Sequence, residues 1–250
     1  MKIVTIVGAR PQFIKAATLS RVFAEHPHRF EEVIVHTGQH FDKNMSDIFF
    51  EEMEIPRANY NLNIHGLSHG AMTGQMLEGI EKVLREEKPD YVLVYGDTNS
   101  TIAGALAAKK LHTPVVHVEA GLRSFNMGMP EEVNRILTDR ISDVLFCPTQ
   151  TAVNNLANEG FKNFDSNVYI TGDVMQDAAM YYKVKSNSKS TILNDLDVEK
   201  GKFILGTIHR AENTDDLTRL NEIVSALNQV NAQNRLIVPL HPRTRNVLAK

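Results

Sequence analysis

The sequence predicts an α/β fold in which helices cover both faces of a parallel β-sheet. Short apolar runs, typical of buried strands, recur along the first part of the chain. Stretches with apolar residues at helical spacing separate these runs, and polar residues follow several of them, where the strands of such a sheet end. Alternation of strand and helix favours parallel strands joined by right-handed crossovers, which is a doubly wound α/β domain.

The elements of this first domain follow one another in a regular order. Buried strands are expected at residues 3–7, 33–36, 91–95, 115–118, 144–147 and 168–171. Helical spacing is clearest in two of the stretches between them, where the apolar positions are Met72, Met76, Ile80, Val83 and Leu84 in one and Ile102, Leu106 and Ala107 in the other. We therefore expect the amino-terminal domain to span residues 1–172.

The pattern changes after this domain. A short helix is expected through Tyr182, and residues 183–200 are polar without apolar periodicity, so residues 173–200 are predicted to be a bridging helix and a linker. A second unit follows, with a strand at 203–208, a helix carrying Leu217, Leu220, Ile223, Val224, Leu227 and Val230, and a strand at 236–240. Because two parallel strands cannot cover their own faces, we expect residues 201–250 to be the start of an incomplete carboxy-terminal domain.

The composition excludes several classes of protein. The chain has 250 residues, 42% of them hydrophobic, and its 27 Lys and Arg residues are dispersed at a formal net charge of -3, so a nucleic-acid partner is not expected. The apolar run before Gly8 is too short for a signal peptide or a membrane span, which favours a cytoplasmic location without a membrane partner. Cys147, the single cysteine, ends an apolar run and is interpreted as a buried hydrophobic residue without a catalytic role.

The segment after the first predicted strand carries two cations. It reads GARPQFIK, with Arg10 at a turn and Lys15 on the first turns of a helix. A helix amino terminus beside two cations is typical of a diphosphate site. A surface arginine and a solvated lysine are the alternative interpretation of this segment alone.

Carboxylates follow the next two central strands. Asp97 ends one of them and would lie over a ligand cleft, although Asp97 or Thr98 would also serve as a plain helix N-cap. Glu119 ends the neighbouring strand. Glu131 and Arg135 then lie four residues apart on one helical face, where a surface ion pair is the alternative.

The last cluster, His209 and Arg210, ends the first strand of the second unit. Carboxylates, arginines, a lysine and a histidine at so many strand ends favour a catalytic site over coincidence. Metal catalysis is not expected. His117 and Glu119 imitate the start of a zinc deaminase motif, but its cysteine pair is missing, and His36 and His40 are expected in a loop.

Six segments resemble, in order and spacing, the non-hydrolysing UDP-N-acetylglucosamine 2-epimerases of bacteria, and they are GARPQFIK, HTGQH, YGDTNST, HVEAGLRS, PEEVNR and HRAEN. The variants GARPQFIKAA and NMSDIFFEEM are most similar to the subgroup acting on UDP-2,3-diacetamido-2,3-dideoxyglucuronic acid in surface-polysaccharide synthesis. The resemblance implies two facing Rossmann-like domains in the glycosyltransferase-B arrangement, the second truncated here. It also implies a homodimer that binds a UDP-sugar and uses neither nicotinamide nor metal.

The resemblance also implies a mechanism that fits the chemistry of the sugar. The hydrogen on C2 of an N-acetylhexosamine is not next to a carbonyl, so simple deprotonation gives no stabilised carbanion. The turn at Gly8 departs from the glycine fingerprint of nicotinamide-binding domains. The implied route eliminates UDP across C1 and C2 to a glycal and adds it back with C2 protonated on the opposite face.

Elimination needs cations for the leaving diphosphate and carboxylates that carry protons on two faces of the sugar. The roles expected for this chain assign Arg10, Lys15, His209 and Arg210 to the diphosphate, and Asp97, Glu119 and Glu131 to proton transfer and ring orientation. Arg135 is expected to organise Glu131. The resemblance adds Gln39 and Asn213 as substrate-binding residues, and which carboxylate acts on which face stays open.

Three other functions remain open from sequence. A glycosyltransferase of the same architecture would need an acceptor and would show no exchange at C2. A nucleotide-sugar binding module, or an inactive fragment, would bind UDP without chemistry. A hydrolysing epimerase would release free N-acetylmannosamine and UDP.

Overall fold

The computed structural model describes residues 1–39, 54 and 57–248. The chain forms two compact units, Met1–Tyr182 and Lys183–Lys250, and each is described by itself. His40 of the motif HTGQH and the segment NMSDIFFEEM, residues 44–53, are outside the described residues.

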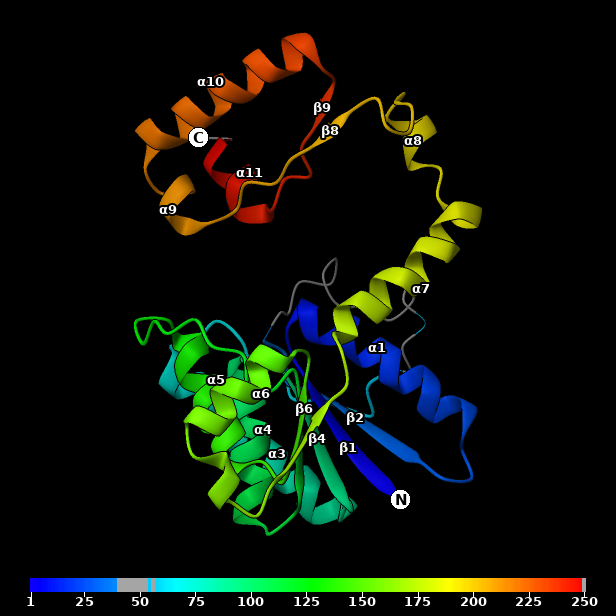
Figure 1. Ribbon diagram of the computed structural model, residues 1–250, viewed down its shortest axis with the longest axis vertical. Helices are drawn as coiled ribbons and strands as arrows, with labels where there is room; N and C mark the ends of the chain where they lie inside the picture. Colours follow the sequence, from blue (N-terminus) through cyan, green and yellow to red (C-terminus); the bar gives the residue numbers. More distant parts are fainter. Residues whose placement is uncertain (40–53, 55–56, 249–250) are drawn as a thin grey trace. The chain divides into compact units, whose positions relative to one another are not determined.

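The first unit is built on a parallel seven-stranded sheet (Figure 1). Its strands are β1 (Lys2–Val7), β2 (Glu31–His36), β3 (Tyr60–Asn61), β4 (Tyr91–Tyr95), β5 (Val115–Val118), β6 (Val144–Cys147) and β7 (Asn167–Ile170). Their order across the sheet is β3-β2-β1-β4-β5-β6-β7, so the direction of winding reverses between β1 and β4. The predicted doubly wound α/β fold and its strands are confirmed, and β3 escaped prediction because two residues carry no alternation pattern.

Helices flank the sheet on both faces (Figure 1). They are α1 (Arg10–Glu25), α3 (His69–Glu87), α4 (Asn99–Lys110), α5 (Pro130–Ile141), α6 (Gln150–Asn158), the 3-10 helix η1 (Phe161–Asn163) and α7 (Val174–Lys189). Successive residues of a strand point to opposite faces, so each central strand contributes to two cores. Val4 and Ile6 of β1 pack on the face covered by α3 and α4, whereas Ile3 and Val7 pack on the face covered by α1.

The end of the first unit differs from the sequence-based expectation. Residues 183–200 were expected to be a loop or linker, but α7 continues to Lys189 and α8 (Ile192–Asp195) follows. A helix that is polar on all sides has no apolar stripe, so its sequence carries no periodic signal. Among the helices of the described residues, none combines the length and apolar character needed to cross a membrane.

The second unit contains the expected β-α-β unit. Strands β8 (Ile204–Leu205) and β9 (Leu236–Ile237) pair in parallel, and the helices are α9 (Ala211–Thr214), α10 (Leu217–Gln233) and α11 (Pro242–Leu248). Asp216 caps α10 by accepting hydrogen bonds from the N–H groups of Thr218 at 2.9 Å and Arg219 at 3.1 Å. Both strands are shorter than predicted, because only two residues of each strand pair with the other strand.

Cys147 lies at the end of β6 and is fully buried. Burial raises the pKa of its thiol to about 12. A buried thiol that holds its proton is a poor nucleophile, which agrees with the structural role predicted for it.

Candidate active site

Four of the predicted site residues lie at the carboxyl ends of β1, β4 and β5 or on the helices that follow. Arg10 begins α1, Lys15 lies one turn further along it, Asp97 follows β4, and Glu119 follows β5. These strands are neighbours at the point where the winding reverses, which is where open parallel sheets bind ligands. The structure therefore brings together residues from segments that are far apart in sequence.

Lys15 and Glu119 form an ion pair between the Lys15 Nζ and the Glu119 Oε2 atoms. The Lys15 side chain is 9% exposed and that of Glu119 is 22% exposed, so solvent screens this pair less than a surface pair. Glu119 has a φ of +73°, which is costly for a residue with a side chain. The turn is held because the N–H groups of Glu119 and Ala120 both donate to the Phe146 carbonyl, at 3.1 and 3.0 Å.

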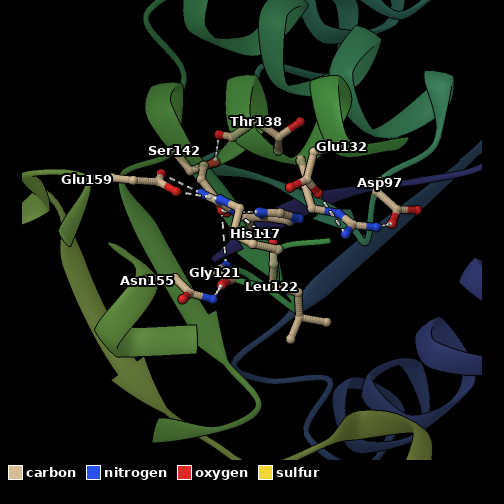
Figure 2. Close-up of polar contacts among 12 residues, drawn as sticks. Asp97, His117, Gly121, Leu122, Glu132, Thr138, Ser142, Asn155 and Glu159 are labelled. Atoms are coloured by element: carbon tan, nitrogen blue, oxygen red, sulfur yellow. Dashed lines mark hydrogen bonds and ion pairs between the residues drawn. The ribbon is translucent and has the colours of Figure 1, made fainter. Parts of the chain in front are cut away.

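Asp97 forms a second ion pair, with Arg135 of α5 (Figure 2). The Asp97 side chain is 32% exposed, so it is open to a ligand while one of its oxygens contacts the Arg135 guanidinium. The other arm of that guanidinium donates to Glu132 Oε2 at 3.0 Å. Arg135 therefore ties Asp97 to α5.

This arrangement corrects the expectation for Arg135. We expected it to organise Glu131, but it contacts Asp97 and Glu132 instead. Glu131 is exposed, and among the described residues no hydrogen bond or ion pair involves its side chain. Adjacent helical residues point in directions about 100° apart, so Glu132 faces inward where Glu131 does not.

Glu132 is a structural residue that the sequence interpretation missed. Its side chain is 1% exposed and accepts hydrogen bonds from the N–H groups of Ser124 at 3.0 Å and Phe125 at 2.7 Å. Burial raises the pKa of its carboxyl group, but these hydrogen bonds and the charge of Arg135 together lower it below its usual value. Glu132 thereby fixes the loop that leads into α5.

The turn at Gly8 is also held by a buried side chain. The Gln12 Oε1 atom accepts hydrogen bonds from the N–H groups of Gly8 and Ala9 at 2.9 and 3.0 Å. A Cβ atom at Gly8 would lie 2.1 Å from the Thr37 Oγ1 atom, so no larger residue fits there. The sequence interpretation noted Arg10 and Lys15 in this segment and missed Gln12, whose inward direction only the packing reveals.

Gln39 reaches the beginning of α4. Its Oε1 atom accepts hydrogen bonds from the hydroxyl group of Ser100 at 2.8 Å and from the N–H of Ser100 at 3.3 Å. Gln39 therefore lies beside the helix that follows Asp97, although it follows a different strand.

A buried charge network lies beneath the β4 and β5 ends (Figure 2). Asp139 of α5 contacts His117 of β5 at 2.7 Å and the Arg123 guanidinium at 2.7 Å. Arg123 also binds both carboxylate oxygens of Glu159, each at 2.7 Å. A polar residue inside an otherwise apolar strand, as His117 is, was the sequence signal that could have indicated this network.

The remaining predicted residues lie in the second unit. His209 and Arg210 are exposed after β8, and the His209 and His241 rings lie 5.9 Å apart. Asn213 lies in α9, and its N–H donates to the Arg210 carbonyl at 3.0 Å. These three residues form one cluster at the strand end, as predicted for a parallel β-α-β unit.

The first unit thus presents two partly exposed carboxylates, each with a cationic partner, at adjoining strand ends. Such groups can transfer protons, and Lys15 and Arg135 supply positive charge beside them, while Arg10 begins the helix that carries Lys15. Within the described ranges, no three or more His, Cys, Asp and Glu side chains are placed to hold a metal ion.

The sequence model of the family described as UDP-N-acetylglucosamine 2-epimerase matches residues 23–250. A relative in Pseudomonas aeruginosa, a UDP-2,3-diacetamido-2,3-dideoxy-D-glucuronate 2-epimerase, is 57% identical over 100% of this chain and 69% of its own length. A UDP-N-acetylglucosamine 2-epimerase homolog of Methanococcus maripaludis is 55% identical over 100% of this chain and 68% of its own.

The chain is also similar to solved structures. The crystal structure of Methanocaldococcus jannaschii UDP-GlcNAc 2-epimerase in complex with UDP-GlcNAc and UDP matches it with a TM-score of 0.88 and 43% identity. That match covers 100% of this chain and 68% of the other.

Proposed function

Since the chain belongs to the UDP-N-acetylglucosamine 2-epimerase family, we propose that it is a non-hydrolysing isomerase that inverts C2 of a UDP-linked 2-acetamido sugar. The proposed substrate is UDP-2,3-diacetamido-2,3-dideoxyglucuronate, with UDP-N-acetylglucosamine as the second candidate. The substrate assignment is supported by the 57% identity to the Pseudomonas aeruginosa relative of that specificity.

One observation supports the chemistry most strongly, the two ion pairs at the ends of β4 and β5. They place the carboxylates of Asp97 and Glu119 beside the same turn, since a Cβ on Gly96 would lie 3.6 Å from Glu119 Oε2 and Asp97 is the next residue. Two carboxylates at one site can serve two faces of a sugar, which epimerisation requires and simple binding does not.

In the proposed mechanism, a carboxylate removes the proton from C2 while the C1–O bond to UDP breaks. The C–H electron pair forms the C1=C2 double bond of a glycal, and UDP leaves with the electron pair of the C1–O bond. UDP oxygen then adds back to C1, and a second acid delivers a proton to the opposite face of C2. Asp97, Glu119 and Glu131 are assigned to these proton transfers.

The leaving diphosphate needs compensating positive charge, because its charge rises as the C1–O bond breaks. We assign Arg10, Lys15, His209 and Arg210 to this task, and His209 is also assigned to the catalytic groups. Gln39 and Asn213 are assigned to substrate binding. Arg135 acts in this proposal by holding Asp97.

The biological setting is part of the proposal. A homodimer in the cytoplasm that supplies an activated sugar for surface polysaccharides fits the proposed substrate, since nucleotide sugars are made where nucleotides are available. Light scattering of the purified protein tests the dimer, and a monomer at all concentrations would contradict it.

The test uses the protein at the full length that its gene encodes, incubated with each UDP-sugar in deuterated buffer and followed by proton NMR. Deuterium at C2 together with the C2 epimer of the UDP-sugar is the expected result. Saturable UDP binding without exchange would indicate a binding module, a requirement for an acceptor would indicate a glycosyltransferase, and release of free sugar would indicate a hydrolysing epimerase.

A further inference from the structure

His117 lies in the middle of β5 with no exposed surface, and both of its ring nitrogens contact acceptor oxygens. The Nε2 atom lies 2.7 Å from the Gly96 carbonyl, and the Nδ1 atom lies 2.7 Å from Asp139 Oδ1. Its neighbours in the strand are Val116 and Val118, so an apolar residue would suit this position. The His117 ring instead makes polar contacts with α5 and with the turn after β4, which an apolar residue could not make.

The partners of the ring determine where its hydrogens lie. A carbonyl oxygen only accepts, so Nε2 must carry a hydrogen that it donates to Gly96. The second oxygen of Asp139 accepts from the Gly121 N–H at 3.0 Å and from Arg123 at 2.7 Å, as a carboxylate does. Nδ1 and Asp139 Oδ1 therefore share one hydrogen between them.

Charge balance in the network points the same way. Asp139 is fully buried and the Arg123 side chain is 1% exposed, while Glu159 is 34% exposed. Without a hydrogen between Nδ1 and Asp139 Oδ1, these three groups and the ring would carry one excess negative charge in a buried region, which is costly. That one hydrogen makes the four groups neutral together, whichever of the two atoms carries it.

The carbonyl that His117 holds belongs to the turn that carries Asp97. Three successive carbonyls of this turn each accept from a side chain, Tyr95 from Gln12 at 3.0 Å, Gly96 from His117 at 2.7 Å and Asp97 from Asn134 at 2.9 Å. Gly96 is in the left-handed region, with a φ of +63°. The peptide between Gly96 and Asp97 is planar, so fixing the Gly96 oxygen also fixes the direction of the Asp97 N–H and the position of the Asp97 Cα atom from which the side chain starts.

We propose that His117 is a positioning residue for the proposed epimerisation, and that its ring, through the hydrogen bond to the Gly96 carbonyl, sets the direction of the Asp97 carboxylate. His117 touches neither substrate nor the reacting atoms. It acts because a buried ring braced by Asp139 holds the peptide that begins Asp97 in one orientation. This inference rests on the proposed function.

Two substitutions separate the two hydrogen bonds of the ring. The amide nitrogen of a glutamine can reach the position of Nε2 and donate to Gly96, whereas the shorter asparagine can replace only Nδ1 and donate to Asp139. H117Q therefore keeps the bond on which the proposal depends, and H117N loses it. Each variant keeps one hydrogen bond of the ring and loses the other, so we expect both to lose stability.

The measurement is kcat and KM for both variants of the full-length protein, with UDP affinity and thermal unfolding of each. A displaced catalytic group can cost about a hundredfold in rate, so we expect kcat of H117N to fall at least about tenfold below that of H117Q, with UDP affinity of both near that of the wild type. Equal kcat values in the two variants, or kcat values that follow the melting temperatures, would overturn the proposal.

The hydrogen bond to Gly96 is tested separately by nitrogen NMR of the histidine side chains, with H117Q used to assign the His117 signals. A hydrogen on Nε2 at neutral pH is expected, and a neutral ring without that hydrogen would overturn the proposal. Failure of the proposed function looks different. A wild-type protein without C2 exchange removes that function and the positioning role with it, whereas an active wild type with equal variants removes only the role of His117.

Discussion

The strand ends after β4 and after β8 hold their site residues in different ways. After β4, three successive carbonyls accept hydrogen bonds from side chains, and the carboxylate of Asp97 is paired with Arg135. After β8, His209 and Arg210 are exposed, and the strand itself is two exposed residues long. We infer that the first region is built for the geometry that proton transfer needs, and the second for binding that tolerates adjustment.

This difference predicts which kinetic constant each region controls. Variants after β4 should lower kcat and leave UDP affinity intact, and variants of Arg210 after β8 should weaken UDP binding, whereas His209 is assigned to both tasks.

Asp97→Asn is expected to abolish turnover, a loss of at least about a thousandfold, because an amide cannot exchange a proton with C2. UDP affinity, measured by calorimetry, should stay within about twofold of the wild-type value, because Asp97 is assigned to proton transfer and not to binding of the diphosphate. Asp165→Asn, an exposed aspartate of the same unit, is the matched control and should be as active as the wild type. Near-normal turnover of Asp97→Asn would remove this residue from the catalytic set.

Glu131 and Glu132 give a contrast between neighbours. Glu131→Gln is expected to abolish turnover with UDP binding and thermal stability retained, because its side chain is exposed. Glu132→Gln should lower stability by about 1–3 kcal/mol, since a buried carboxylate loses its charge between Arg135 and two N–H donors. Denaturant unfolding and kcat, measured for both variants, test this contrast between the two residues. An active Glu131→Gln variant would overturn the assignment of Glu131 to proton transfer.

Gly96→Ala tests whether the shape of the β4 turn matters beyond backbone strain. Gly96 has a φ of +63° and an added Cβ would lie 3.1 Å from Lys15 Nζ, whereas Gly172 has a φ of +84° with nothing within 4 Å. Both alanine variants should lose about 1–2 kcal/mol of stability through left-handed strain. We expect kcat to fall about tenfold or more in Gly96→Ala alone, because the Lys15 and Glu119 pair must shift. Equal kcat values would show that this contact is unimportant.

Arg210→Ala should weaken UDP binding about tenfold, or about 1.4 kcal/mol, with the melting temperature almost unchanged because the residue is exposed. Lys200→Ala removes one positive charge from an exposed residue of the same unit and should bind UDP normally. If Arg210→Ala instead lowered kcat and kept UDP affinity, the division between the two regions would be wrong.

The smallest effect concerns the pH dependence of stability. The pKa of Glu132 is lower in the folded protein than its usual value, so its charge stabilises the fold above that usual value. This contribution is lost as pH falls through the folded pKa. The stability difference between wild type and Glu132→Gln should therefore be largest near neutral pH and shrink in acid, and a constant difference across this range would contradict the account.

The sequence predicted those parts of the molecule that local patterns determine. Apolar runs gave the strands, and their ends located Lys15, Asp97 and Glu119, because parallel strands bring their carboxyl ends to one edge. It was harder to predict which side chains contact one another in the folded protein. Helical spacing predicted that Arg135 pairs with Glu131. Which face of α5 points inward depends on how the helix packs on the sheet, and in the structure Arg135 contacts Asp97 and Glu132 instead.

Two further features could not be located from local patterns, although His117 stands out as a polar residue in an apolar strand. The contact between His117 and Asp139 joins residues 22 positions apart, and neither belongs to a periodic pattern that indicates the other. Helix α7 extends into residues that are polar on every side, so composition alone suggested a loop.

The central claim, that C2 is inverted through departure and return of UDP, is tested most directly by isotope exchange with a substrate labelled with ¹⁸O at the oxygen between C1 and the β-phosphate. The full-length protein should move this label to non-bridging positions of the β-phosphate while deuterium enters C2, because free UDP can rotate before it adds back. Inversion at C2 with all of the label still in the bridge, after complete equilibration, would show that the C1–O bond never breaks and would contradict the account.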